Sequence, residues 1–109
     1  MQILSTFKQG QLTLRLVGEL DHHAAKLAMN AIGREIDLNL PTQCLVDCAS
    51  LGFMDSSGIA VVLNVHKRMV ELSGEAIILN VPQQAMKVLN AAGIERIVHI
   101  KEPALQGGV

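Results

Sequence analysis

The sequence predicts one small α/β domain with a mixed, mostly parallel sheet, an N-terminal hairpin and helices packed on it. Strand-like alternation opens the chain, three stretches with helical spacing of apolar residues follow, and short apolar runs separate them. Successive strand, helix and strand units require parallel pairing and right-handed crossovers. At 109 residues the chain suffices for one core, so we expect a single domain over residues 1–109, ending in a short tail from about residue 101.

The first half of the chain predicts a hairpin followed by a helix. Residues 11–18 alternate between apolar and polar side chains, as a half-buried strand does, and residues 3–7 are the expected hairpin partner. Between residues 23 and 38, apolar positions recur at spacings of three and four, which indicates an amphipathic helix that ends before Pro41. The apolar face of this helix is expected to comprise Ala24, Leu27, Ala28, Ala31, Ile32 and Ile36.

The second half predicts two crossover units and a closing strand. Apolar runs without alternation at residues 44–46 and 76–79 predict strands covered on both faces. Helical spacing from Ile59 to Val70 predicts a helix between them, with Gly74 at its C-terminal cap. We expect a third helix to open at Pro82, a good first-turn residue, and a last strand at residues 97–100.

Composition argues against nucleic acid and membranes as partners. The chain has only two aromatic residues and a formal net charge of -1, so it offers neither bases a stacking platform nor phosphates a basic surface. No apolar run approaches the roughly 18 residues that span a bilayer, and we expect a cytoplasmic protein. Cys44 and Cys48, placed in one expected strand, would be about 13 Å apart, beyond the roughly 7 Å limit for a disulfide, and are expected to be reduced core residues.

The stretch with the most chemistry is Phe53-Met54-Asp55-Ser56-Ser57-Gly58-Ile59, at an expected strand-to-helix junction. With Asp55 as N-cap of the second helix, Met54 and Ile59 have the spacing of a hydrophobic staple. A phosphate on Ser56 would also meet first-turn amides that lack intrahelical partners, at the positive end of the helix dipole. The junction therefore suits both a helix cap and a phosphoacceptor serine.

A second polar loop, Gly18-Glu19-Leu20-Asp21-His22-His23, opens the first helix, with Asp21 as its expected cap. In a parallel α/β sheet, the loops after the carboxyl ends of the strands gather at one edge. We therefore expect Asp21 to lie close to the Asp55-Ser56 turn, forming a polar edge suited to docking.

Catalytic and metal-binding patterns are missing. The Gly-x-Ser-x-Gly elbow is absent around Ser56, which argues against a triad of Asp21, His22 and Ser56. His22 and His23 are adjacent, point different ways and have no third ligand at a known spacing. Gly18 stands alone where a dinucleotide-binding turn needs three glycines, and no Cys-x-x-Cys is present. We expect no enzyme, no metal and no cofactor.

Together the two polar loops resemble the STAS family, and within it the anti-sigma F factor antagonists of spore-forming bacteria. The resemblance spans nearly the whole chain. The Asp-Ser-Ser-Gly turn at residues 55–58 is shared widely by anti-anti-sigma proteins, and Glu-Leu-Asp-His-His at residues 19–23 is more typical of the sporulation branch. The resemblance implies that the unphosphorylated protein binds an anti-sigma factor that is also a serine kinase, and so frees the sigma factor.

The same resemblance implies the roles of the site residues. Ser56, directly after the aspartate, is the implied phosphoacceptor; the kinase brings ATP and Mg²⁺, and a serine phosphatase restores the binding form. Gly58 would allow close backbone approach, and Asp21 would border the docking surface. The implied partner-binding residues are Asp21, His22, His23, Asp55, Ser57 and Gly58. Relatives of this branch usually end in a further helix, whereas here residues 102–105 are followed closely by two glycines, leaving room for only a very short one.

Two alternatives remain open. One is a STAS module of stress signalling or of a transporter, which binds a partner without a sporulation role. The other is a receiver domain phosphorylated on Asp47, which ends a central strand, with Lys101 after the last strand. A receiver needs an acidic pair after its first strand, and the leading hairpin does not fit that topology.

Overall fold

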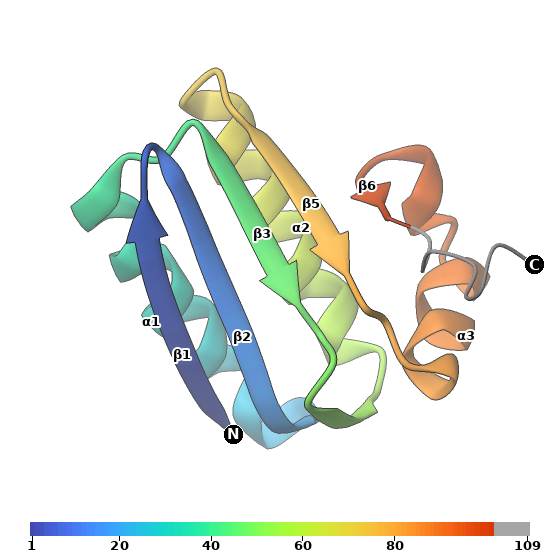
Figure 1. The fold of residues 1–109 in the computed structure, drawn as a ribbon. Coiled ribbons are helices and arrows are strands. Elements are labelled where there is room, and N and C mark those ends of the chain that lie inside the picture. Colours follow the sequence, from blue (N-terminus) through green and yellow to red (C-terminus); the bar gives the residue numbers. More distant parts are fainter. Residues whose placement is uncertain (102–109) are drawn as a thin grey trace, which may run out of the picture.

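The computed structural model describes residues 1–101, and Figure 1 shows its arrangement. The elements follow the expected order, with one additional strand and one 3₁₀ turn. The expected tail and the question of a last helix concern residues that, from 102 on, lie outside the described part. The elements are β1 (Gln2–Lys8), β2 (Gln11–Leu20), α1 (His22–Asn39), β3 (Gln43–Asp47), β4 (Leu51–Met54), α2 (Ser57–Glu71), β5 (Glu75–Leu79), α3 (Gln83–Ala91), η1 (Ile94–Arg96) and β6 (His99–Ile100).

The sheet is mixed and mostly parallel, which confirms the predicted fold class. Its order is β1-β2-β3-β5-β6; β1 runs antiparallel to β2, and the other pairs are parallel. β4 is the strand that the sequence did not predict, and it pairs with the carboxyl end of β2. In Figure 1, α1 and α2 lie behind the sheet, and the chain passes from β2 and β3 toward the helix starts at the lower edge. That edge carries both polar loops.

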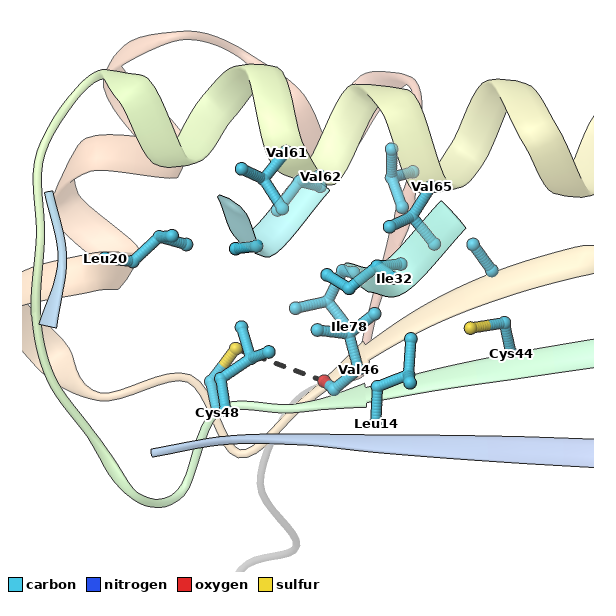
Figure 2. Packing of buried hydrophobic residues seen from close by; sticks show 14 of the residues in the cluster. Leu14, Leu20, Ile32, Cys44, Val46, Cys48, Val61, Val62, Val65 and Ile78 are labelled. Carbon is cyan, nitrogen blue, oxygen red and sulfur yellow. Dashed lines mark hydrogen bonds between the residues drawn. The ribbon is translucent and has the colours of Figure 1, made fainter. Parts of the chain in front are cut away.

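The core fills the space between α1, α2 and the sheet. Alternate residues of β2, β3 and β5 are buried there, in agreement with the alternation that predicts β2. In Figure 2, Leu14, Val46 and Ile78 of neighbouring strands lie below Val62 and Val65 of α2. Aliphatic side chains thus form a continuous core beneath both helices.

The prediction that β3 and β5 are covered on both faces is wrong for residues 1–101. Their buried residues alternate with half-buried ones, among them Leu45, Ile77 and Leu79, which point away from α1 and α2. The outward positions are aliphatic too, so the sequence shows an unbroken apolar run even though helices cover one face of the sheet. An apolar run in a strand therefore did not distinguish one covered face from two.

The helical spacing located α1 and α2 correctly but made their buried faces too wide. Leu27 of α1 is 74% exposed and Val70 of α2 is 57% exposed, although both were expected to face the core. Ala25 is buried in α1 instead. α3 begins at Gln83, directly after Pro82, so the proline precedes the first turn rather than occupying it. The expected strand at residues 97–100 shrinks to β6, because residues 97 and 98 form the turn that follows η1, where both donate to Ile94 O.

The C-terminus of α2 forms a Schellman motif in which Ser73, and not Gly74, adopts the left-handed conformation. Ser73 has φ 58°, its N–H donates to Val70 O (3.0 Å), and the N–H of Gly74 donates to Met69 O (2.7 Å). Gly74 is required for a different reason: a Cβ there would lie 2.6 Å from Thr42 O. The expected cap is thus one residue earlier than predicted, and the glycine serves a close backbone approach.

Substitutions at these two positions should have opposite effects on stability. Ser73→Gly relieves a left-handed non-glycine residue and should raise the free energy of unfolding by about 0.5–1 kcal/mol. Gly74→Ala places a methyl group against a backbone oxygen and should lower it by more than about 1 kcal/mol. Urea unfolding of both variants beside the wild type measures the two changes; a gain in stability for Gly74→Ala would contradict this packing.

Both cysteines are free, buried core residues, as expected. Cys48 follows β3 rather than lying in it, and its N–H donates to Leu79 O (2.9 Å). Figure 2 shows the two thiols well apart along the core. Burial raises the pKa of Cys44 and of Cys48 from 9.0 to about 12, and the charge of Asp47 adds to the effect at Cys48.

The raised pKa values predict a loss of stability at alkaline pH. Above pH 9 the thiols of the unfolded chain lose protons while the folded ones keep theirs, so the stability that is fully present below pH 9 falls as the pH rises toward about 12. Each thiol should contribute a slope of up to about 1.4 kcal/mol per pH unit within this window. Unfolding free energies of wild type and Cys44→Ala between pH 8 and 11 test this: the variant should have the shallower slope, and equal slopes would refute the assignment.

Candidate functional site

The two polar loops meet at the carboxyl edge of the sheet because β2 and β4 are parallel neighbours. Leu20 pairs with Met54 at their ends, and the N–H of Asp55 donates to Leu20 O (3.3 Å). The next residue along each strand, Asp21 or Asp55, introduces a helix. The prediction that Asp21 lies close to the Asp55-Ser56 turn is therefore confirmed, and β4, which the sequence does not predict, brings the two together.

Asp21 caps α1, as predicted. Its backbone is extended (φ -100°, ψ -176°), and its Oδ1 accepts a hydrogen bond from the N–H of Ala24 at 2.9 Å. Its carbonyl oxygen accepts from the N–H groups of Ala24 and Ala25. Capping thus fixes the carboxylate of Asp21 at the start of α1, where it remains half-buried.

Asp55 serves both helix starts with one carboxylate. Oδ1 accepts from the N–H of Ser57 (2.8 Å) at the start of α2, and Oδ2 accepts from the N–H of His22 (3.1 Å) at the start of α1. The residue directly before α2 is Ser56, one later than expected for the cap, yet Asp55 supplies the capping oxygen. Since amides at helix starts lack intrahelical partners, this carboxylate satisfies one in each helix.

Ser56 presents its side chain to solvent. It has helical backbone angles (φ -62°, ψ -19°), and within residues 1–101 its hydroxyl makes no capping hydrogen bond. Ser57, by contrast, is half-buried, with its N–H held by Asp55. Of the two adjacent hydroxyl groups, that of Ser56 belongs to the more accessible residue.

Gly58 is buried, and its missing side chain serves packing inside the domain. A Cβ there would lie 2.5 Å from Cγ and 2.9 Å from Sδ of Met54, and 3.2 Å from Leu20 Cδ2. The first turn of α2 thus lies directly on the fully buried side chain of Met54. The close neighbours of Gly58 are thus side chains of this domain, Met54 and Leu20, and not a backbone segment.

His22 and His23 lie on the surface at the start of α1. Their rings are arranged edge to face with centroids 6.0 Å apart. The carboxylates of Asp21 and Asp55 accept backbone N–H groups here. Residues 1–101 contain no group of three or more His, Cys, Asp or Glu side chains that could hold a metal ion.

Asp47 would be the phosphoacceptor in the receiver alternative, but its side chain makes hydrogen bonds that hold the loop after β3. Its Oδ1 accepts from the N–H of Ala49 (3.0 Å) and from Nδ2 of Asn80 (3.1 Å). The hairpin of β1 and β2 precedes α1, a topology that a receiver lacks. Both observations disfavour the receiver alternative.

Gln84 is a site residue that sequence reasoning missed. From the first turn of α3 its side-chain amide bonds to the backbone of Met54: Nε2 donates to Met54 O (2.7 Å), and Met54 N–H donates to Oε1 (2.9 Å). No motif announces such a contact, because the two residues are 30 positions apart. They come together only because α3 packs beside β4.

Comparison with known proteins places these loops in a family. Residues 2–103 match the model of the STAS domain. The anti-sigma F factor antagonist of Paenibacillus polymyxa is 30% identical over 100 residues, which cover 92% of this chain and 86% of that protein. Within the described residues, no helix is long and apolar enough to cross a membrane.

Two solved structures extend the similarity. The anti-sigma factor antagonist SpoIIAA in its unphosphorylated form shows a TM-score of 0.78 at 27% identity, over 93% of this chain and 89% of that one. The Bacillus cell fate determinant SpoIIAA in the phosphorylated form shows 0.70 at 27% identity, over 93% and 92%. The chain is thus similar to relatives known in both phosphorylation states.

Removing the carboxylate of Asp55 should destabilise the domain through both helix starts. Asp55→Ala leaves the N–H groups of Ser57 and His22 without their acceptor and should lower the free energy of unfolding by about 2–3 kcal/mol. Asp55→Asn keeps one carbonyl oxygen and should lose roughly half as much. Chemical unfolding measures both variants.

The matched control for this prediction is Asp37→Ala. Asp37 pairs with Arg68 on the surface, and both side chains are substantially exposed. Such a pair contributes about 0–1 kcal/mol. Equal losses at positions 37 and 55 would show that the carboxylate of Asp55 does not bridge the two helices.

Proposed function

Because the chain belongs to the STAS domain family, we propose that it is an anti-sigma factor antagonist whose partner binding is switched by phosphorylation of Ser56. The observation that carries this proposal is the exposed Ser56 held at a helix start, directly after the carboxylate that fixes both loops. The existence of SpoIIAA in unphosphorylated and phosphorylated forms supports it. The chain acts as a substrate and binding protein, and the kinase supplies the catalysis.

The proposed partner is an anti-sigma factor that is also a serine kinase. The unphosphorylated chain binds it and thereby releases the sigma factor. The binding surface comprises the two loops around Ser56, with Asp21, His22, His23 and Asp55 at the edge of the sheet and Ser57 beside the acceptor. Gly58 contributes through the packing of α2, since it is buried. This surface includes a shallow pocket of about 450 Å³ whose lining residues include Gly18, Glu19, Asp21 and His23.

Phosphoryl transfer requires only an accessible, well-positioned hydroxyl from this chain. Oγ of Ser56 forms a bond to the γ-phosphorus of ATP, the bond from that phosphorus to the bridging oxygen breaks, and ADP leaves. The hydroxyl proton passes to a base of the kinase, which also holds ATP and Mg²⁺. A serine phosphatase hydrolyses the phosphate and restores the binding form. We place this cycle in the cytoplasm, which also suits two reduced core thiols.

Phosphorylation weakens binding in this proposal through charge. The phosphate adds about -1.5 to -2 charges beside Asp55 and close to Asp21. The docking edge thereby becomes strongly negative without any need for the sheet or the core to change. A partner surface complementary to the unphosphorylated edge would then meet repulsion and the cost of desolvating the phosphate.

The phosphoacceptor assignment predicts a clear difference between two neighbouring serines. Incubation with the cognate kinase and ATP, followed by mass mapping, should show one phosphate on wild type and on Ser57→Ala, and none on Ser56→Ala. Ser56→Ala should still bind the kinase, because it keeps Asp55 and both loops. Phosphate elsewhere than Ser56 would overturn the assignment.

A pull-down with wild type and Ser56→Asp tests the switch itself. The wild type should retain the kinase, and the acidic variant should retain it at least about tenfold less well, as expected for a loss of about 1.4 kcal/mol. Equal retention of the same partners by both proteins would contradict the switch. Capture of a partner without kinase activity would instead favour a STAS module of another signalling system.

A further inference from the structure

Gln84 supplies the peptide-like partner that the end of β4 lacks. β4 pairs with β2 on one side, where the N–H of Asp55 donates to Leu20 O. Because successive residues of a strand direct their backbone groups to opposite sides, the N–H and C=O of Met54 point away from β2. On that side, Oε1 of Gln84 accepts from the N–H of Met54, and Nε2 of Gln84 donates to the carbonyl oxygen of Met54.

The chemistry of this contact is that of a neighbouring strand. A glutamine amide offers one carbonyl acceptor and an NH₂ donor, the same groups as a peptide unit. An unpaired strand edge exposes backbone groups that would otherwise bind water or another strand. Gln84 therefore closes the edge of β4 at its last residue, directly before Asp55 and Ser56.

Met54 transmits this restraint to the start of α2. Its backbone is held by Gln84, and its fully buried side chain lies under Gly58. The contact is so close that only a residue without a Cβ fits at position 58. A shift of the Met54 backbone would move this side chain against Gly58 and displace the first turn of α2. The position of Ser56 thus depends on a side chain from α3.

We propose that Gln84 is a positioning residue of the segment Met54–Ser57, holding Ser56 where a kinase can phosphorylate it. The structural part of this proposal, that the amide fixes the backbone of Met54, rests on the two hydrogen bonds. The part that concerns phosphate transfer rests on the proposed function. Since α3 packs on β4 and on η1, Gln84 also links the segment to the C-terminal part of the described chain.

Two pairs of variants isolate the amide. Gln84→Leu removes donor and acceptor at similar size, and Gln84→Glu keeps the shape but replaces the NH₂ donor by an oxygen that repels Met54 O. Gln83→Leu and Gln83→Glu are the matched controls, because Gln83 is exposed and lies one position earlier in the same helical turn. Each control carries the same change in charge and hydrophobicity.

Amide hydrogen exchange followed by NMR tests the structural part without any partner. Exchange at Met54 should accelerate about tenfold in Gln84→Leu, which removes the acceptor of the Met54 N–H, and the amide signals of Ser56 and Ser57 should shift in both Gln84 variants. Neither should change in the Gln83 variants. Exchange of β2 and β3 reports whether the domain remains folded; if Gln84→Leu accelerates exchange there as well, Gln84→Glu decides the outcome. Unchanged exchange at Met54 in a folded Gln84→Leu, or unshifted signals of Ser56 and Ser57 in Gln84→Glu, overturns the proposal.

Kinetics with the cognate kinase test the functional part. Misplacement of the acceptor hydroxyl should reduce kcat for Ser56 phosphorylation at least about fivefold, with KM changed less than about twofold, because alignment is lost and the docking loops remain. The Gln83 variants should match the wild type. Wild-type kcat in both Gln84 variants, despite faster exchange at Met54, overturns the positioning role. A wild type without phosphate on Ser56 overturns the proposed function, and the exchange data then still decide whether the amide holds Met54.

Discussion

The carboxylate of Asp55 joins the starts of α1 and α2, because it accepts from the N–H of His22, 33 residues earlier in the chain, and the geometry of the edge that carries both polar loops depends on this bridge. This bridge is possible because β2 and β4 end side by side, so that the residues after them, Asp21 and Asp55, lie at the same edge of the sheet. α1 and α2 together cover the core, which means that the same constraint orients the helices and sets the surface. A carboxylate with two acceptor oxygens suits this position, since it receives one helix-start amide on each.

The bridge changes how a phosphate on Ser56 would be received. Sequence reasoning alone suggested that free first-turn amides could bind it. In the structure Asp55 already accepts the amide of Ser57, and its carbonyl accepts that of Gly58. A phosphate on Ser56 would therefore compete with Asp55 for the amides of Ser57 and Gly58. Two unit charges 4 Å apart repel by about 1 kcal/mol in water and more near a protein surface, so under the proposed switch the phosphate would repel the carboxylate of Asp55 as well as any acidic group of a partner.

The sequence predicted the parts of the site that follow from local rules. Asp21 and Asp55 were identified because aspartate at a helix start has a specific hydrogen-bonding role, and their proximity followed from parallel strand topology. β4 was missed because its four residues have no alternation, with Leu51 and Met54 buried and Gly52 and Phe53 exposed between them. Gln84 was missed because its bonds depend on how α3 lies beside β4, which periodicity does not encode. Leu27 was placed wrongly because spacing alone does not fix the width of a buried face.

Three restraints converge on the residues that precede Ser56: pairing with β2, the bridge of Asp55 and the amide of Gln84. Such a segment is unlike the extended, adaptable peptides that a kinase can draw into its own cleft. Under the proposed switch, the kinase must recognise Ser56 on a folded edge that it also binds through Asp21 and His22. Docking and phosphorylation then share one surface, and the charge added to Ser56 acts on the contacts that brought the kinase there. Phosphorylation therefore also promotes release of the product from the kinase, because each phosphorylated molecule loses the surface that made it a substrate.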